Sequence, residues 1–125
     1  MIKRVDIDEG ESPILVARVT DYGGTPITTG LIIDVEIKLF CLSSATPAEE
    51  LWVSTGNPGS AYYSDTLTHQ YDNILGDTGG SNFVLVFSPQ EYAMVGTNTY
   101  RLQVVTNTTA FTNVDRWDLV VGAVL

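Results

Sequence analysis

Three side chains that could form a nucleophilic site lie close together in the sequence: Ser64, Asp65 and His69. In a Ser-His-Asp site the imidazole takes the hydroxyl proton, and the carboxylate orients the imidazole. The fold usually brings such residues together from distant positions, and Ser64 lacks the G-x-S-x-G setting of a strained nucleophile turn. We therefore predict no catalytic residue here and place His69 at the surface.

The single cysteine, Cys41, ends an alternating apolar segment behind Leu39. A cysteine in that position is typically a buried, inert thiol. With one Cys and one His, the chain can form no internal disulfide and supplies no Cys/His zinc cluster. We predict that the protein is not an enzyme and uses no cofactor.

Two acidic tracts could offer oxygen ligands to a calcium ion, but neither has the full spacing of a calcium-binding loop. We predict no metal site and interpret the acids as groups that keep the protein soluble and protect an edge strand. The tracts are Asp6, Asp8, Glu9 and Glu11, and Asp72 with Asp77.

The charge of the 125-residue chain excludes some partners. Its formal net charge is −9, so its surface should repel nucleic acid and anionic membranes alike. Between Leu39 and Tyr100 there is no Lys or Arg, so the acids there form either a solvated face or a surface that attracts a basic partner. These acids are Glu49, Glu50, Asp65, Asp72, Asp77 and Glu91.

The apolar periodicity is that of strands. From Leu31 to Cys41, apolar and polar residues alternate with a period of two. Short strands with frequent turns predict a two-sheet antiparallel sandwich in one domain, residues 1–125. We predict strands around residues 5–7, 14–20, 31–41, 51–54, 62–68, 83–87, 100–104 and 117–121, and a loop over residues 72–82.

One short helix is predicted after the strand that ends at Phe87. Ser88 is placed as its N-cap, Pro89 at its first position and Glu91 where it can bond back to the cap. Gly96 would end it after about two turns.

Several segments carry a resemblance to a known group. In Asn98-Thr99-Tyr100-Arg101-Leu102, Tyr100 sits where an immunoglobulin-like domain has its tyrosine corner, two residues before a core position. With the Ser88-Pro89-Gln90-Glu91 segment, the turn from Thr20 to Pro26 and the closing segment from Trp117 to Gly122, the chain resembles small immunoglobulin-like virion proteins of tailed bacteriophages. The similarity is to N-terminal domains of upper baseplate proteins and to capsid-decoration domains. It implies an all-β, immunoglobulin-like antiparallel β-sandwich of seven to eight strands with one short helix before the sixth strand.

The resemblance also implies a function: a non-enzymatic structural component of the virion, foremost a capsid decoration or cement protein. A tail baseplate or connector subunit, or a polysaccharide-binding module, is the alternative. The expected partners are the major capsid or tail protein of the same particle, and further copies of the chain. The acidic N-terminus predicts no signal peptide, and no apolar run is long enough to span a membrane, so we expect synthesis in the host cytoplasm. The resemblance implies that the protein is then located in the virion.

Aromatic and terminal residues are the candidate contacts. Trp52, Tyr62 and Tyr63, with Tyr71, lie in the least regular part of the sequence, where they could anchor an interface, stack on sugar rings or be core. Val124 and Leu125 continue the last strand without a charged side chain. We predict partner contacts at Trp52, Tyr62, Tyr63, Val124 and Leu125.

Overall fold

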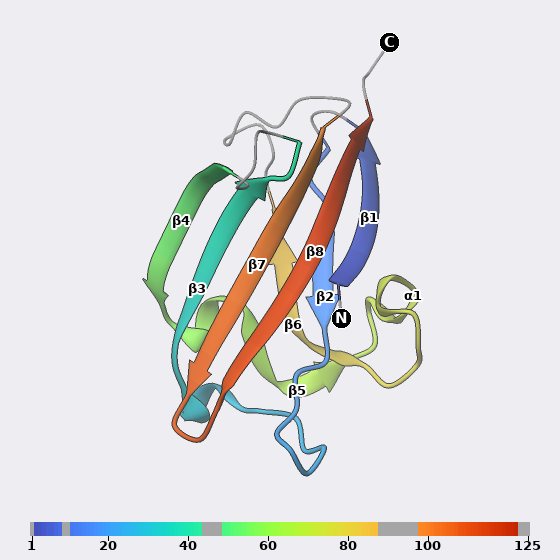
Figure 1. Cartoon of the computed structure of the whole chain (residues 1–125). Coiled ribbons are helices and arrows are strands. Elements are labelled where there is room, and N and C mark those ends of the chain that lie inside the picture. The colour runs from blue at the N-terminus through green and yellow to red at the C-terminus, as the bar shows by residue number, and fades with distance from the viewer. Residues whose placement is uncertain (1, 9–10, 44–48, 88–97, 123–125) are drawn as a thin grey trace.

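A computed structural model describes residues 2–8, 11–43, 49–87 and 98–122 of the chain. These residues form eight strands in two sheets that pack face to face (Figure 1). The predicted all-β sandwich is therefore confirmed. The strands are β1 (Ile2–Asp8), β2 (Ile14–Ala17), β3 (Ile32–Cys41), β4 (Glu49–Asn57), β5 (Tyr63–Thr68), β6 (Ser81–Val86), β7 (Thr99–Thr108) and β8 (Thr112–Gly122).

The strand order follows that of an immunoglobulin-type sandwich. One sheet has the order β2-β6-β5, and the other has the order β1-β8-β7-β3-β4. In immunoglobulin lettering, strands B, E and D share one sheet, and C, F and G share the other. Here β2, β6 and β5 occupy the places of B, E and D, while β3, β7 and β8 occupy those of C, F and G.

One strand departs from the antiparallel prediction. β1 pairs with β8 in parallel, with Ile2 opposite Arg116 and Asp8 opposite Gly122, whereas the other strand pairs are antiparallel. Antiparallel neighbours can be joined by a short hairpin, but parallel neighbours need a crossover connection. Here the connection between the two partners contains all the strands from β2 to β7. The first strand, β1, forms one edge of the larger sheet and pairs with the last strand, β8.

The structure contains a short helix in a segment that the sequence analysis predicts to be a loop. The tract from residue 72 to 82, predicted as a loop, contains a single helical turn, α1 (Asp72–Leu75), and the start of β6, so the loop prediction was wrong there. Asp72 supplies an acid to the first turn, and Gly76 ends the helix at φ 93°, a left-handed conformation that favours glycine. One turn is too short to give a periodic apolar signal. The predicted helix from Ser88 to Gly96 lies outside the described residues.

The core lies between the sheets and is centred on Phe83. Its ring stacks on Trp117 with centroids 5.8 Å apart and meets the edge of Tyr63 at 5.1 Å. Alternate residues of β3, β7 and β8 complete the core. The thiol of Cys41 is buried as predicted. Two short 3-10 turns, η1 (Thr29–Leu31) and η2 (Gly59–Ala61), lie at the end of the sandwich where β3 begins.

Candidate functional site

The three residues that suggested a nucleophilic site are not assembled into one. The Ser64 hydroxyl donates to the Thr66 carbonyl at 2.7 Å, and Asp65 accepts from the Thr29 amide. His69 is exposed, and its Nδ1 pairs with the Asp72 carboxylate at 2.9 Å. Each of the three groups is thus bound to a different neighbour.

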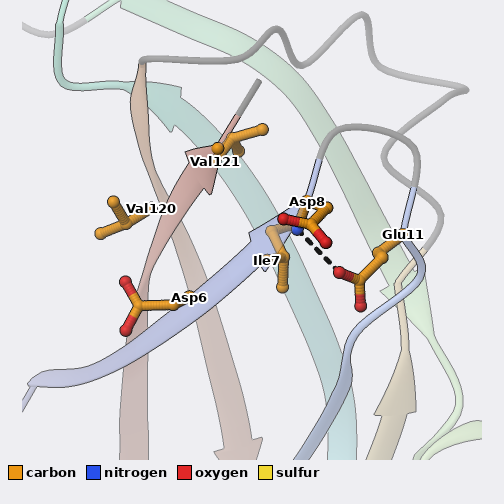
Figure 2. Close-up of a pocket in the computed structure, with 7 residues that line it drawn as sticks. Asp6, Ile7, Asp8, Glu11, Val120 and Val121 are labelled. Atoms are coloured by element: carbon orange, nitrogen blue, oxygen red, sulfur yellow. Dashed lines mark hydrogen bonds between the residues drawn. The ribbon is translucent and has the colours of Figure 1, made fainter. Parts of the chain in front are cut away.

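Three acids of the N-terminal tract, Asp6, Asp8 and Glu11, help to line a hollow of about 300 Å³ where β1 and β8 end (Figure 2). Glu11 reaches back to accept the Asp8 amide at 2.8 Å, while Asp6 points away from both and pairs with Arg4. Glu9 lies outside the described residues. Within the described ranges, no group of three or more His, Cys, Asp or Glu side chains could hold a metal ion.

The second acidic pair is engaged by a cation. Arg18, next to the end of β2, holds the Asp77 carboxylate with two nitrogens, each 2.8 Å from an oxygen. The hydrogen bond from Arg18 lowers the pKa of Asp77 to about 2. Although residues 42–99 contain no Lys or Arg, their acids are not wholly unopposed, because the fold brings Arg18 to this segment.

The prediction that Tyr63 is a partner contact does not agree with its position in the core. Its side chain is buried at 5% exposure, and its hydroxyl hydrogen-bonds to the Thr106 hydroxyl of β7 at 2.7 Å. Burial raises the pKa of this phenol. Tyr63 faces the core because it is the residue of β5 that lies opposite Phe83.

The other predicted contact residues have varied positions. Trp52 of β4 is half-buried and packs on Phe87, with ring centroids 6.3 Å apart. Tyr62 is half-buried against Phe83 at 6.2 Å, so both side chains keep some exposed surface. Val124 and Leu125 lie outside the described residues.

The five-stranded sheet leaves one side uncovered by any described element, and we call this side the outer face (Figure 1). Its residues are those that alternate with the core positions. Val105 and Val114 lie opposite one another on β7 and β8, and Val114 is 39% exposed. The apolar side chains of the outer face include Ile2, Phe40, Val53, Val105, Val114 and Val120.

Several charged groups on the outer face are paired. Arg101 of β7 binds Asp118 of β8 at 2.7 Å, and Lys38 lies 3.6 Å from Glu36 on β3. Four of the chain's six cations lie on this face: Arg4, Lys38, Arg101 and Arg116. Sequence alternation predicted that Lys38 and Glu36 point outward, but only strand register shows that the cations of other strands join them.

The three-stranded sheet has a different exposed feature, a groove of about 430 Å³ over β5 and β6. Tyr62, Tyr71 and Val84 all line this groove, and Val84 belongs to β6, the central strand of the sheet. We call it the β5–β6 groove. Sequence analysis had singled out both tyrosines as aromatic residues of the irregular middle segment.

A comparison with known protein families and with curated proteins finds no match to this chain. The fold therefore defines its class, an all-β sandwich with one five-stranded and one three-stranded sheet. Among the described residues, no helix is long and apolar enough to cross a membrane.

Proposed function

We propose that the chain is a non-enzymatic structural subunit of a tailed-phage particle. It docks through the outer face onto the major capsid or tail protein, foremost as a capsid decoration or cement protein. The observation that carries this proposal is the outer face itself, where apolar side chains and paired charges lie on a broad sheet that no described element covers.

The size of the outer face suits a stable interface. Five strands at about 4.8 Å spacing give a width of about 24 Å, and ten residues of β7 at about 3.4 Å each give a length of about 34 Å. The product is about 800 Å², the area that each partner of a specific interface typically buries.

The chemistry of the outer face also favours docking. Burying an unpaired charge is costly, but a charge that is already paired can enter an interface at a smaller cost. Arg101 and Asp118 are paired in this way across two strands. The net charge of −9 keeps other surfaces solvated and opposes contact between them.

The test is incorporation into particles purified from the source of the gene. Quantitative mass spectrometry should find the chain there, at a copy number comparable to that of the coat protein if it decorates the shell and far lower if it belongs to the tail. Absence of the chain from the particles would refute the proposal.

A matched pair of variants tests the docking surface. Val114→Glu places a charge on the outer face, where Val114 is 39% exposed, and should lower incorporation by about tenfold or more. Val86→Glu makes the same change on the other sheet, where Val86 is 60% exposed, and should be incorporated like the wild type. Equal incorporation of both variants would show that the outer face is not the docking surface. Circular dichroism of both confirms that they fold.

A further inference from the structure

We infer that the β5–β6 groove binds a neutral oligosaccharide. This site lies on the opposite sheet from the outer face and does not depend on the proposed docking. The groove volume of about 430 Å³ falls within the range of about 300–1,000 Å³ that is usual for small-ligand sites.

The groove is uncharged although the protein is strongly acidic. None of the residues that line it is Asp, Glu, Lys, Arg or His, in a chain whose net charge is −9. A phosphate or carboxylate ligand is normally held by Arg or Lys, and a cationic ligand by carboxylates. The lining supplies neither, so it fits a neutral ligand.

The polar groups of the groove suit a ligand rich in hydroxyls. Its polar lining residues include Ser64, Thr66, Thr68 and Gln70, together with the tyrosines Tyr62 and Tyr71. Hydroxyl and amide groups can each donate and accept hydrogen bonds. A sugar hydroxyl has the same double capacity, so neighbouring hydroxyls on a pyranose ring can each find a partner here.

Two tyrosine rings add apolar surface to this polar lining. Tyr62 is held by its packing on Phe83, and burial raises the pKa of its phenol. The Tyr71 carbonyl accepts hydrogen bonds from the amides of Ile74 and Leu75, which tie its backbone to α1. A half-buried aromatic ring with a polar end can pack on the C–H face of a sugar while its hydroxyl bonds to the sugar's edge.

The groove walls are fixed before a ligand arrives. The Asn82 side chain, beneath the groove, is buried and bonds to the backbone of Val19 and Ile27. In the segment that follows α1, Arg18 holds Asp77 and the Gly80 carbonyl. Such preorganisation lowers the ordering cost of binding. The acids Asp65 and Asp72, adjacent to lining residues in the sequence, should disfavour anionic sugars.

The experiment is an NMR titration of the full chain with maltohexaose, cellohexaose and chitohexaose, and with oligogalacturonate as the anionic counterpart. We expect at least one neutral hexamer to shift the amide resonances of Tyr62, Ser64, Gln70 and Tyr71 saturably, and oligogalacturonate to shift none of them. No saturable shift with any neutral hexamer, or shifts confined to other residues, would overturn the proposal.

A variant pair ties the binding to the groove. Tyr71→Ala should weaken binding by about tenfold, as expected when one aromatic contact is lost. Tyr22→Ala removes a tyrosine that is 93% exposed in the turn after β2, and should bind like the wild type. Equal affinity of both variants would exclude the groove as the site. Val114→Glu should also bind sugar normally, so failure of this inference and failure of the docking proposal can be told apart.

Discussion

The buried hydrogen bond between Tyr63 and Thr106 joins the two sheets and can be tested directly. Tyr63 lies on β5 of the smaller sheet, and Thr106 on β7 of the larger. Their hydroxyl oxygens are 2.7 Å apart, and Thr106 is fully buried. Tyr63→Phe removes one hydroxyl and leaves the other without this partner in the core, and Thr106→Val does the reverse.

The expected magnitudes follow from burial. An unsatisfied buried hydroxyl costs about 1–3 kcal/mol, so each single variant should lose about that much free energy of unfolding. The double variant removes both hydroxyls and should lose much less than the sum of the single losses. For a chain of this size, we expect the melting temperature to fall by about 3–5 °C for each kcal/mol lost.

The assay is urea unfolding followed by Trp fluorescence, since Trp117 stacks on the Phe83 ring that contacts Tyr63. Tyr22→Phe is the control, because Tyr22 is 93% exposed, and it should leave stability unchanged. Strictly additive losses, or a Tyr63→Phe variant as stable as the wild type, would refute the buried inter-sheet hydrogen bond. Incorporation into particles should be unaffected by Tyr63→Phe, because the side chain has almost no surface to offer a partner.

Two further predictions concern a carboxyl and a glycine. Burial raises the pKa of Asp115, so the folded state favours its protonated form and the ionised carboxylate lowers stability at neutral pH. Asp115→Asn should therefore be more stable than the wild type at pH 7. Urea unfolding at a series of pH values tests this prediction. The gain in stability should fade as the pH falls through the raised pKa of Asp115 towards its pKa in the unfolded chain. At Gly59, an added Cβ would lie 2.9 Å from two Ile32 side-chain atoms, so Gly59→Ala should lose about 1–3 kcal/mol in thermal unfolding. Gly30→Ala is the control, because nothing lies within 4 Å of the added Cβ, and it should not lose stability in this way. Equal losses of stability in the two variants would contradict the close packing of Gly59 on Ile32.

The strands of the larger sheet were predictable because one side is core and the other is polar. The alternation from Leu31 to Cys41 matches β3 almost residue for residue. The strand predicted over residues 100–104 was too short, since β7 continues to Thr108. Thr106 and Thr108 point inward in this part of β7. Because these two core positions hold polar residues, the apolar alternation in the sequence stops before the strand does. A buried polar side chain is stable in a core when it has a hydrogen-bond partner, and the partner of Thr106 is Tyr63, which is distant in the sequence.

The candidate surfaces were less predictable. Tyr62 and Tyr63 are neighbours in the sequence and both contact Phe83, but only Tyr63 belongs to β5, where its register opposite Phe83 buries it. β5 pairs irregularly with β6 between Tyr63 and Thr68, so no simple alternation marks its sides. The outer face likewise combines strands distant in the sequence, and its parallel β1–β8 edge has no local signature.

The two exposed surfaces belong to different sheets, and the core between them makes them structurally separable. Packed sheets lie about 10 Å apart, so substitutions on the outer face and in the β5–β6 groove share no direct contact and should act additively. A subunit docked through the outer face would turn its three-stranded sheet away from the particle. The β5–β6 groove, with Tyr62 and Tyr71, would then face the surroundings, where a sugar could reach it without competing with the coat protein. Particles that carry Tyr71→Ala should accordingly keep the subunit but bind sugar about tenfold more weakly.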